Sequence, residues 1–137
     1  MRASRTIAHP PERVFQFLSD VRNHWRLEDA FIALGEVHAG GGRIRICGPL
    51  GIGRDARTTV VEAVPPRLMR GRAEVGRRTV GIVEWTIEPA NGGSRVFLAA
   101  RVEHASPADR ALLALGGARW LRRRFARVLE HLEAALA

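Results

Sequence analysis

Few side chains in this sequence have the chemistry for acid–base catalysis. The chain has five histidines and 14 Asp and Glu residues, but no tyrosine. An acid–base site needs such a group held in a cavity with a shifted pKa. His104 is the first candidate because it continues one face of an expected strand, although a strand end also fits an exposed side chain. His24 is the second, since it adjoins Trp25 and Arg26 in a polar segment, where a solvated loop is the alternative.

The sequence contains no metal or nucleophile motif. The histidines have no partner at ligand spacing and Cys47 is the only cysteine, so we predict neither a metal nor a cofactor. The segment GPLGIG (48–53) lacks the Lys-Ser/Thr ending of a phosphate loop and joins two expected strands, which predicts a hairpin turn. No G-x-S-x-G elbow is present. Arg57 suits a bidentate contact with an acidic group, but residues 58–61 blur the alternation and leave its strand face open.

Size and composition indicate one globular domain over residues 1–137. The chain is 46% hydrophobic, and a chain of 137 residues can bury a substantial core. No apolar run approaches the roughly 18 residues that a membrane span requires. The N-terminus lacks the apolar region of a signal peptide, and a single cysteine fits a reducing compartment, so we expect a cytoplasmic protein.

The charge has two interpretations. The net charge is +8, and all 22 basic residues are arginine. Such an excess suits a nucleic acid or an anionic membrane, but it also arises when a GC-rich genome replaces Lys by Arg. Aromatic residues make up only 6% and the arginines are spread along the chain, which favours the compositional interpretation. Binding to RNA, the ribosome or an anionic membrane remains an alternative through Arg119, Arg122, Arg123, Arg124 and Arg127.

The elements that would position these groups begin with a strand at 2–8. His9-Pro10-Pro11-Glu12 then opens a helix, and a short helix or turn follows at 20–28. The apolar stripe of the first helix is Val14, Phe17, Leu18 and Val21. Alternating segments at 31–38, 43–47, 57–64, 67–75, 79–88 and 94–104 predict six further strands. Their connections are too short for parallel crossovers, so we expect antiparallel neighbours.

The last part of the chain predicts one long amphipathic helix over residues 106–136. Ser106 and Pro107 suit its start. Gly116-Gly117 interrupts its first half, and glycine destabilises a helix interior, so we expect a bend or a close backbone approach there. The expected buried ridge is Leu121, Phe125, Val128, Leu132 and Leu136.

Strand alternation places small residues in the middle of the concave sheet face. These are Gly71, Ala73, Gly81 and Ala100. A filled core would place Val, Ile or Leu at such positions. Small residues there either leave a void or let the helix approach the sheet closely.

Four segments, read with this order of elements, carry a family resemblance. They are TIAHPPERVFQFLSDVRNHW, TTVVEAVPPRLM, IVEWTIEPANGGSRVFL and RRRFARVLEHLEAAL. The chain resembles the START-like or SRPBCC superfamily, and more narrowly its polyketide cyclase/dehydrase and lipid-transport group. The resemblance implies an α+β helix-grip fold. In that fold, a seven-stranded curved antiparallel sheet wraps around a long C-terminal helix, with two short helices after the first strand.

With that architecture, the small residues favour a void over close packing. We expect a small hydrophobic, lipid- or polyketide-like ligand in a cavity between sheet and helix, bound by a monomer or a homodimer. A polyketide cyclase or dehydratase that uses His104 with His24 or Arg57 is the alternative. Trp25 is expected at the pocket mouth, and Trp85 also fits a plain core residue. The expected ligand-binding residues are Trp25, Met69, Gly71, Ala73, Gly81, Val83, Trp85, Leu98, Ala100, Val102, Leu121 and Phe125.

Overall fold

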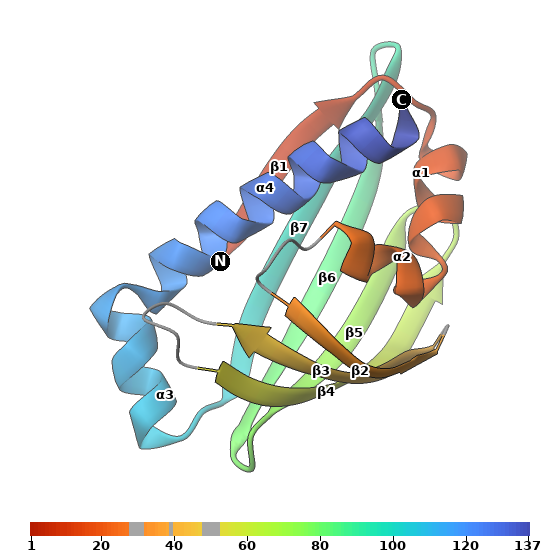
Figure 1. The fold of residues 1–137 in the computed structure, drawn as a ribbon. Helices are drawn as coiled ribbons and strands as arrows, with labels where there is room; N and C mark the ends of the chain where they lie inside the picture. Colours follow the sequence, from red (N-terminus) through yellow and green to blue (C-terminus); the bar gives the residue numbers. More distant parts are fainter. Residues whose placement is uncertain (28–31, 39, 48–52) are drawn as a thin grey trace.

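The computed structural model describes residues 1–27, 32–38, 40–47 and 53–137 (Figure 1). Within α2 and β2, the side chains of Val21, Trp25 and residues 32–38 are also outside the description. The elements are β1 (Arg2–Ile7), α1 (Pro11–Leu18), α2 (Val21–Arg26), β2 (Ile32–His38), β3 (Gly41–Cys47), β4 (Gly53–Val64), β5 (Leu68–Val75), β6 (Thr79–Ala90), β7 (Gly93–His104), α3 (Pro107–Leu112), the π-helical turn η2 (Leu113–Gly117) and α4 (Ala118–Leu136).

The strands form one antiparallel sheet in the order β1-β7-β6-β5-β4-β3-β2. Each strand from β2 to β7 pairs with its neighbour in sequence, and β1 closes on β7. The predicted antiparallel neighbours are therefore confirmed. The sheet curves around one side on which α4 lies obliquely (Figure 1). This curved sheet with a C-terminal helix fits the predicted helix-grip class.

The strand predicted over 57–64 starts earlier than expected. β4 begins at Gly53, so that residue belongs to a strand and not to the predicted turn at 48–53. Residues 48–52 of that turn, and Phe31 at the start of another predicted strand, lie outside the described residues. The sequence misled here because Gly53, Arg54 and Asp55 have low strand propensity, which pairing with β3 overrides.

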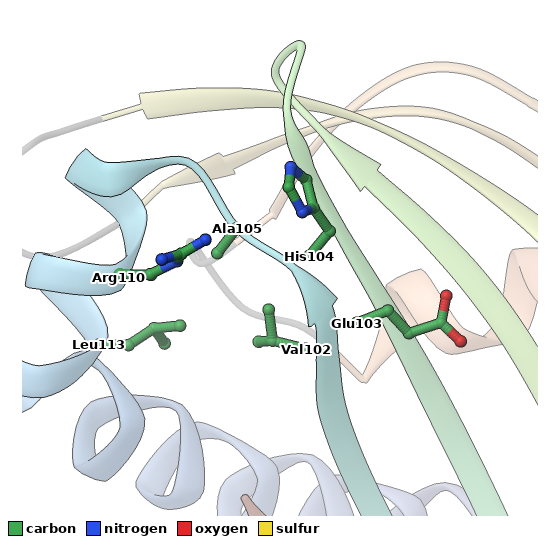
Figure 2. Close-up of a pocket in the computed structure, with 6 residues that line it drawn as sticks. All are labelled: Val102, Glu103, His104, Ala105, Arg110 and Leu113. Atoms are coloured by element: carbon green, nitrogen blue, oxygen red, sulfur yellow. The ribbon is translucent and has the colours of Figure 1, made fainter.

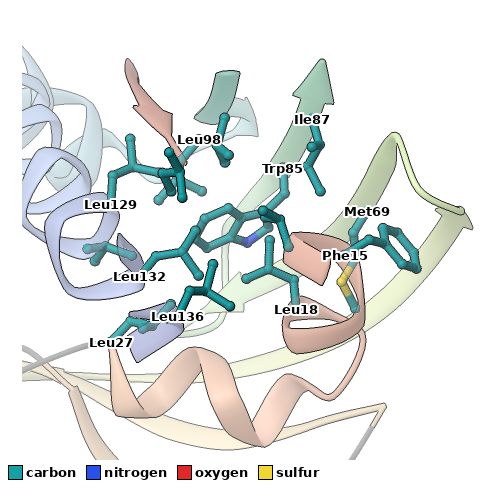
Figure 3. Packing of buried hydrophobic residues seen from close by; sticks show 14 of the residues in the cluster. Phe15, Leu18, Leu27, Met69, Trp85, Ile87, Leu98, Leu129, Leu132 and Leu136 are labelled. Atoms are coloured by element: carbon teal, nitrogen blue, oxygen red, sulfur yellow. The ribbon is translucent and has the colours of Figure 1, made fainter. Parts of the chain in front are cut away.

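The core lies at the end of the molecule where α1 and the last turns of α4 meet the sheet. α1 buries Val14, Phe15 and Leu18. The predicted stripe had Phe17 in place of Phe15, but Phe17 is only half-buried. Trp85 lies in the middle of this cluster, between the helices and the sheet (Figure 3). We call this region the sealed end.

The C-terminal helix is interrupted, which corrects the expectation of one helix over 106–136. α3 and α4 are separated by η2, in which Gly116 has a φ of 123°. Residues other than glycine rarely adopt this backbone conformation. The predicted bend therefore falls at a residue that tolerates it. Beyond the bend, α4 buries Phe125, Val128, Leu129, Leu132 and Leu136. The predicted ridge lacked Leu129, and its first member, Leu121, is half-buried.

α4 packs mainly on β1, with fewer contacts to β7. The Arg5 guanidinium on β1 donates to the Glu133 carboxylate on α4 at 3.0 Å. The Arg13 guanidinium on α1 donates to the Leu136 carbonyl at 3.2 Å. The helix is thus fixed near one edge of the sheet. Within the described chain, no helix combines the length and apolar character needed to cross a membrane.

Candidate ligand-binding site

The predicted concave residues of β5, β6 and β7 lie in three consecutive rows across the sheet. The first row is Met69, Trp85 and Leu98; the second is Gly71, Val83 and Ala100; the third is Ala73, Gly81 and Val102. Each row joins residues that are direct partners in the antiparallel register. Strand alternation thus predicted correctly which of these side chains share a face.

Burial falls from row to row. All residues of the first row are at most 5% exposed. Residues of the second row are half-buried, as are Ala73 and Gly81 in the third. Val102, which ends the third row, is 39% exposed although it continues the same face. The concave face is therefore closed at the first row and open at the third, and we call the region of the second and third rows the open end.

The surroundings of Gly71 and Gly81 distinguish between a void and a close approach of the helix to the sheet. A Cβ built on Gly71 would have only the Thr59 carbonyl oxygen within 4 Å, at 3.5 Å. A Cβ built on Gly81 would meet only the Arg101 carbonyl oxygen, at 3.4 Å. Both atoms belong to neighbouring strands. Among the described residues, no atom of the C-terminal helix lies within 4 Å of either Cβ position, which favours the void.

A pocket of about 430 Å³, largely open to solvent, continues from the third row towards α3, and we call it the cavity. Val102 and Leu113 both point into the space between the end of β7 and the α3–η2 segment, whereas Glu103 points away across β6 (Figure 2). This volume suits a small molecule. The lining residues are Val102, Glu103, His104, Ala105, Arg110 and Leu113.

A polar cluster fixes α3 beside this cavity. The Arg54 guanidinium pairs with the Asp109 carboxylate through both terminal nitrogens, one of them 3.0 Å from Oδ2. The Thr79 hydroxyl donates to the same carboxylate and accepts from the Ser106 backbone N–H at 3.2 Å. Ser106 caps the helix by accepting from the Asp109 N–H. We call Arg54, Thr79, Ser106 and Asp109 the Asp109 cluster.

The electrostatics of this cluster favour ionised Asp109. Its carboxylate is largely buried, and the hydrogen bond from Arg54 is the main cause that lowers its pKa below the ordinary value of 3.8, against the opposing effect of burial. Sequence reasoning missed Arg54, because the predicted strand began at residue 57. A strand starting at Gly53 would have shown that Arg54 shares the face of buried Ala56.

His24 lies at the sealed end and not at the pocket mouth. Its Nε2 is 2.7 Å from the Leu18 carbonyl oxygen, which can only accept, so Nε2 carries the hydrogen. Its ring centroid is 5.5 Å from that of Trp85. Burial is the main cause that lowers the pKa of His24. The expectation of a mouth residue or a solvated loop was therefore wrong, because the α2 turn folds His24 inward.

The other candidate groups are placed differently. His104 is exposed and lines the cavity at the end of β7, but it does not continue the concave face as expected, because a register shift after Val102 pairs it with Val80. Arg57 is exposed and neighbours buried Ala56, so it lies on the convex face and cannot meet a ligand in the concave hollow. Phe125 is buried and Leu121 is half-buried on α4. The side chain of Trp25 is outside the described residues.

Within the described ranges, His, Cys, Asp and Glu side chains form no group of three or more that could hold a metal.

Comparison with known proteins identifies the family. The model of the family described as polyketide cyclase/dehydrase and lipid transport matches residues 1–137. No curated relative matches the sequence.

Several solved structures share the fold. CV1439 from Chromobacterium violaceum is 20% identical with a TM-score of 0.65, covering 99% of this chain and 95% of that one. TTHA0849 from Thermus thermophilus is 20% identical with a TM-score of 0.72 and the same coverage. Ms6760 from Mycobacterium smegmatis is 15% identical with a TM-score of 0.68, covering 99% and 89%. At these identities the likeness concerns the fold alone. Because the family model spans residues 1–137, the chain belongs to the polyketide cyclase/dehydrase and lipid transport family.

Proposed function

We propose that this protein binds a small hydrophobic molecule, lipid- or polyketide-like, in the hollow between the curved sheet and the C-terminal helical segment. The observation that carries the proposal is the fall in burial along one continuous face, from the sealed first row to the exposed Val102. Covering water-exposed apolar side chains on a concave face with an apolar ligand lowers the free energy of the system. Membership of a family with lipid-transport members supports the same conclusion.

The lining also indicates how such a ligand would be oriented. The second and third rows carry only Gly, Ala and Val, which offer no side-chain hydrogen bonds. Ionisable groups that remain at the outer end of the cavity are His104 and Arg110, since Glu103 points away from it. A ligand with an apolar body would lie against the rows and place its polar end near these side chains.

The test uses two neighbouring alanines of β7 as a matched pair. Ala100 belongs to the second concave row, whereas Ala99 points to the convex face opposite Glu84. Ala100→Phe should fill the hollow and weaken binding of the apolar dye Nile red, measured by fluorescence titration, by at least tenfold. Ala99→Phe adds the same volume on the other face and should leave the affinity unchanged.

Stability measurements on the same pair show whether the hollow exists. If it does, Ala100→Phe costs little free energy of unfolding, because the ring occupies empty space. If the interior is filled, the ring overpacks it and the cost is about 1–3 kcal/mol. A protein that takes up neither Nile red nor any component of a lipid extract, and that loses this much stability, would contradict the proposal.

A catalytic function is the second candidate, favoured by His104 and Arg110 in one cavity lining. Cyclisation of a poly-β-ketone needs a general base and stabilisation of the enolate that forms. An imidazole and a guanidinium supply these two functions. A synthetic poly-β-ketone thioester provides the assay: His104→Gln should abolish its cyclisation while Nile red binding persists. Unchanged turnover in that variant would remove His104 from the reaction.

A further inference from the structure

The bend in the C-terminal helix exposes apolar side chains. Leu115 is 85% exposed and Leu112 is 43% exposed. The described large hydrophobic residues with the highest exposure are Val61, Val102, Leu112 and Leu115, so most of them lie at the α3 end of the molecule. Gly116 has a non-helical backbone conformation directly after Leu115, so the most exposed leucine lies at the break between α3 and α4.

Arginines follow these leucines at the start of α4. Arg119, Arg122 and Arg123 are exposed on the first turns of α4. Across the described residues, none of the three forms an ion pair. The only acidic residue between 104 and 129 is Asp109, whose charge is already paired with Arg54. This part of the surface is therefore both apolar and strongly positive.

A tryptophan completes the pattern. Trp120 is half-buried on α4, and the Arg124 guanidinium carbon lies 5.4 Å from its ring centroid. Tryptophan prefers the boundary between water and hydrocarbon, because its ring is apolar and its N–H is polar. We call Leu112, Leu115, Arg119, Trp120, Arg122 and Arg123 the docking tip. It lies at the end of the molecule remote from α1 (Figure 1).

We propose that the docking tip binds an anionic lipid membrane. Leucines would enter the boundary between headgroups and acyl chains, and the arginines would contact lipid phosphates. Leu113 lies between the two exposed leucines and lines the cavity, so docking would bring the cavity to the membrane surface. The proposal goes beyond ligand binding and does not require it, because the docking residues are outside the cavity lining.

The other occupants of such a surface fit less well. An RNA would use the arginines but has no need of exposed leucines beside them. A second copy of the chain would cover the leucines. However, a symmetric contact pairs the same patch on both subunits and would bring the arginines against each other. An anionic membrane satisfies both the apolar and the positive groups.

Co-sedimentation tests the proposal directly. The protein should bind vesicles of phosphatidylcholine that contain phosphatidylglycerol, should bind pure phosphatidylcholine vesicles weakly, and should dissociate as salt increases. Lipids brominated in their acyl chains should quench tryptophan fluorescence in the bound state, and Trp120→Phe should abolish that quenching. Equal binding to both vesicle types, or quenching that persists in Trp120→Phe, would overturn the proposal.

Two variants separate the contributions. Leu112→Ser with Leu115→Ser should weaken vesicle binding by about tenfold or more for each leucine. Arg119→Gln with Arg122→Gln and Arg123→Gln should weaken it on the order of a hundredfold. Val61→Ser is the control, because Val61 is 53% exposed on β4, and should change nothing. All these side chains are exposed, so thermal unfolding should confirm that each variant folds.

Further outcomes decide against the membrane. Loss of RNA binding in the arginine variant, with no binding of any vesicle, would assign the surface to nucleic acid. A dimer in sedimentation equilibrium that the leucine variant dissociates would assign it to self-association. Nile red binding should survive in both docking variants, so failure of the membrane proposal and failure of the ligand proposal can be distinguished.

Discussion

The sealed end and the open end are built from the same three strands and the same C-terminal segment, yet they differ in filling. At the sealed end, Trp85 and its row partners meet α1 and the last turns of α4. At the open end, the next two rows consist of glycine, alanine and valine, and α3 stands at the rim. No change of topology separates the two. Side-chain volume along a continuous face decides where the fold is a filled core and where its concave face stays open.

The largest expected effect is a difference in stability loss between leucine substitutions at the two ends of α4, one at the sealed end and one at the open end. Leu132 on α4 is fully buried, whereas Leu121, three turns earlier, is half-buried. Leu132→Ala should lower the free energy of unfolding by about 2–5 kcal/mol, and Leu121→Ala by roughly 1 kcal/mol. Urea denaturation measures both. Equal losses would mean that α4 packs as tightly over the open end as over the sealed end.

The Asp109 cluster should account for most of the stability at the open end. Asp109→Asn leaves the partly buried Arg54 guanidinium without its counter-charge and should cost about 2 kcal/mol. Asp55→Asn is the control, since Asp55 also pairs with an arginine but its side chain is 84% exposed, and it should cost at most about 0.5 kcal/mol.

The pH dependence of the same variant provides a check. Because Arg54 lowers the pKa of Asp109 in the folded state, this stabilisation is complete above the unfolded value of 3.8. It is lost as the pH falls through the folded pKa. The difference between the native protein and Asp109→Asn should therefore vanish in strong acid, and a difference that persists there would contradict the charge-based explanation.

A smaller effect of opposite sign is expected in the hollow itself. Gly81→Ala should raise the free energy of unfolding by about 0.5–1 kcal/mol, because a methyl group there meets no steric obstacle and restricts the unfolded chain. Gly93→Ala is the contrasting change. Its Cβ would lie 2.1 Å from the Ile7 carbonyl oxygen, so it should destabilise the protein. A destabilising Gly81→Ala would indicate that the open end is packed.

The smallest expected effect is the pH dependence of stability that His24 at the sealed end causes. Burial lowers the pKa of His24 below 6.5, so the unfolded chain takes up a proton first as the pH falls. Stability should therefore decline from about pH 6.5 down to the folded pKa. His24→Gln keeps a donor for the Leu18 carbonyl and should lack this decline. NMR titration of the His24 ring tests the assignment, and a pKa at or above 6.5 would refute it.

Local patterns predicted the parts of this fold that depend on neighbours in sequence. The two-residue alternation of side chains along each strand predicted which residues lie on the concave face. Strand pairing then places these residues side by side in rows. Glycines at 116 and 117 predicted the bend. The family resemblance added the helix-grip arrangement and the expectation of a cavity.

Contacts between distant parts of the chain could not be predicted from the sequence. Arg54 and Asp109 are 55 residues apart, and neither position shows the pairing by its own context. His24 was misplaced because the turn of α2 that brings its ring to Trp85 leaves no periodic signal. Such pairings depend on how complete elements pack, and a single sequence does not encode them as a spacing.

The break at Gly116 also divides the helix macrodipole. α4 begins at Ala118, so the partial positive charge of a helix N-terminus falls on the turn that contains Arg119 and directly precedes Arg122 and Arg123, and this first turn has no acidic residue. An unbroken helix would have placed Arg119 in its middle, where the end effect is absent. The protein therefore carries a local electrostatic frustration at this point, and negative charge supplied from outside the chain would relieve it.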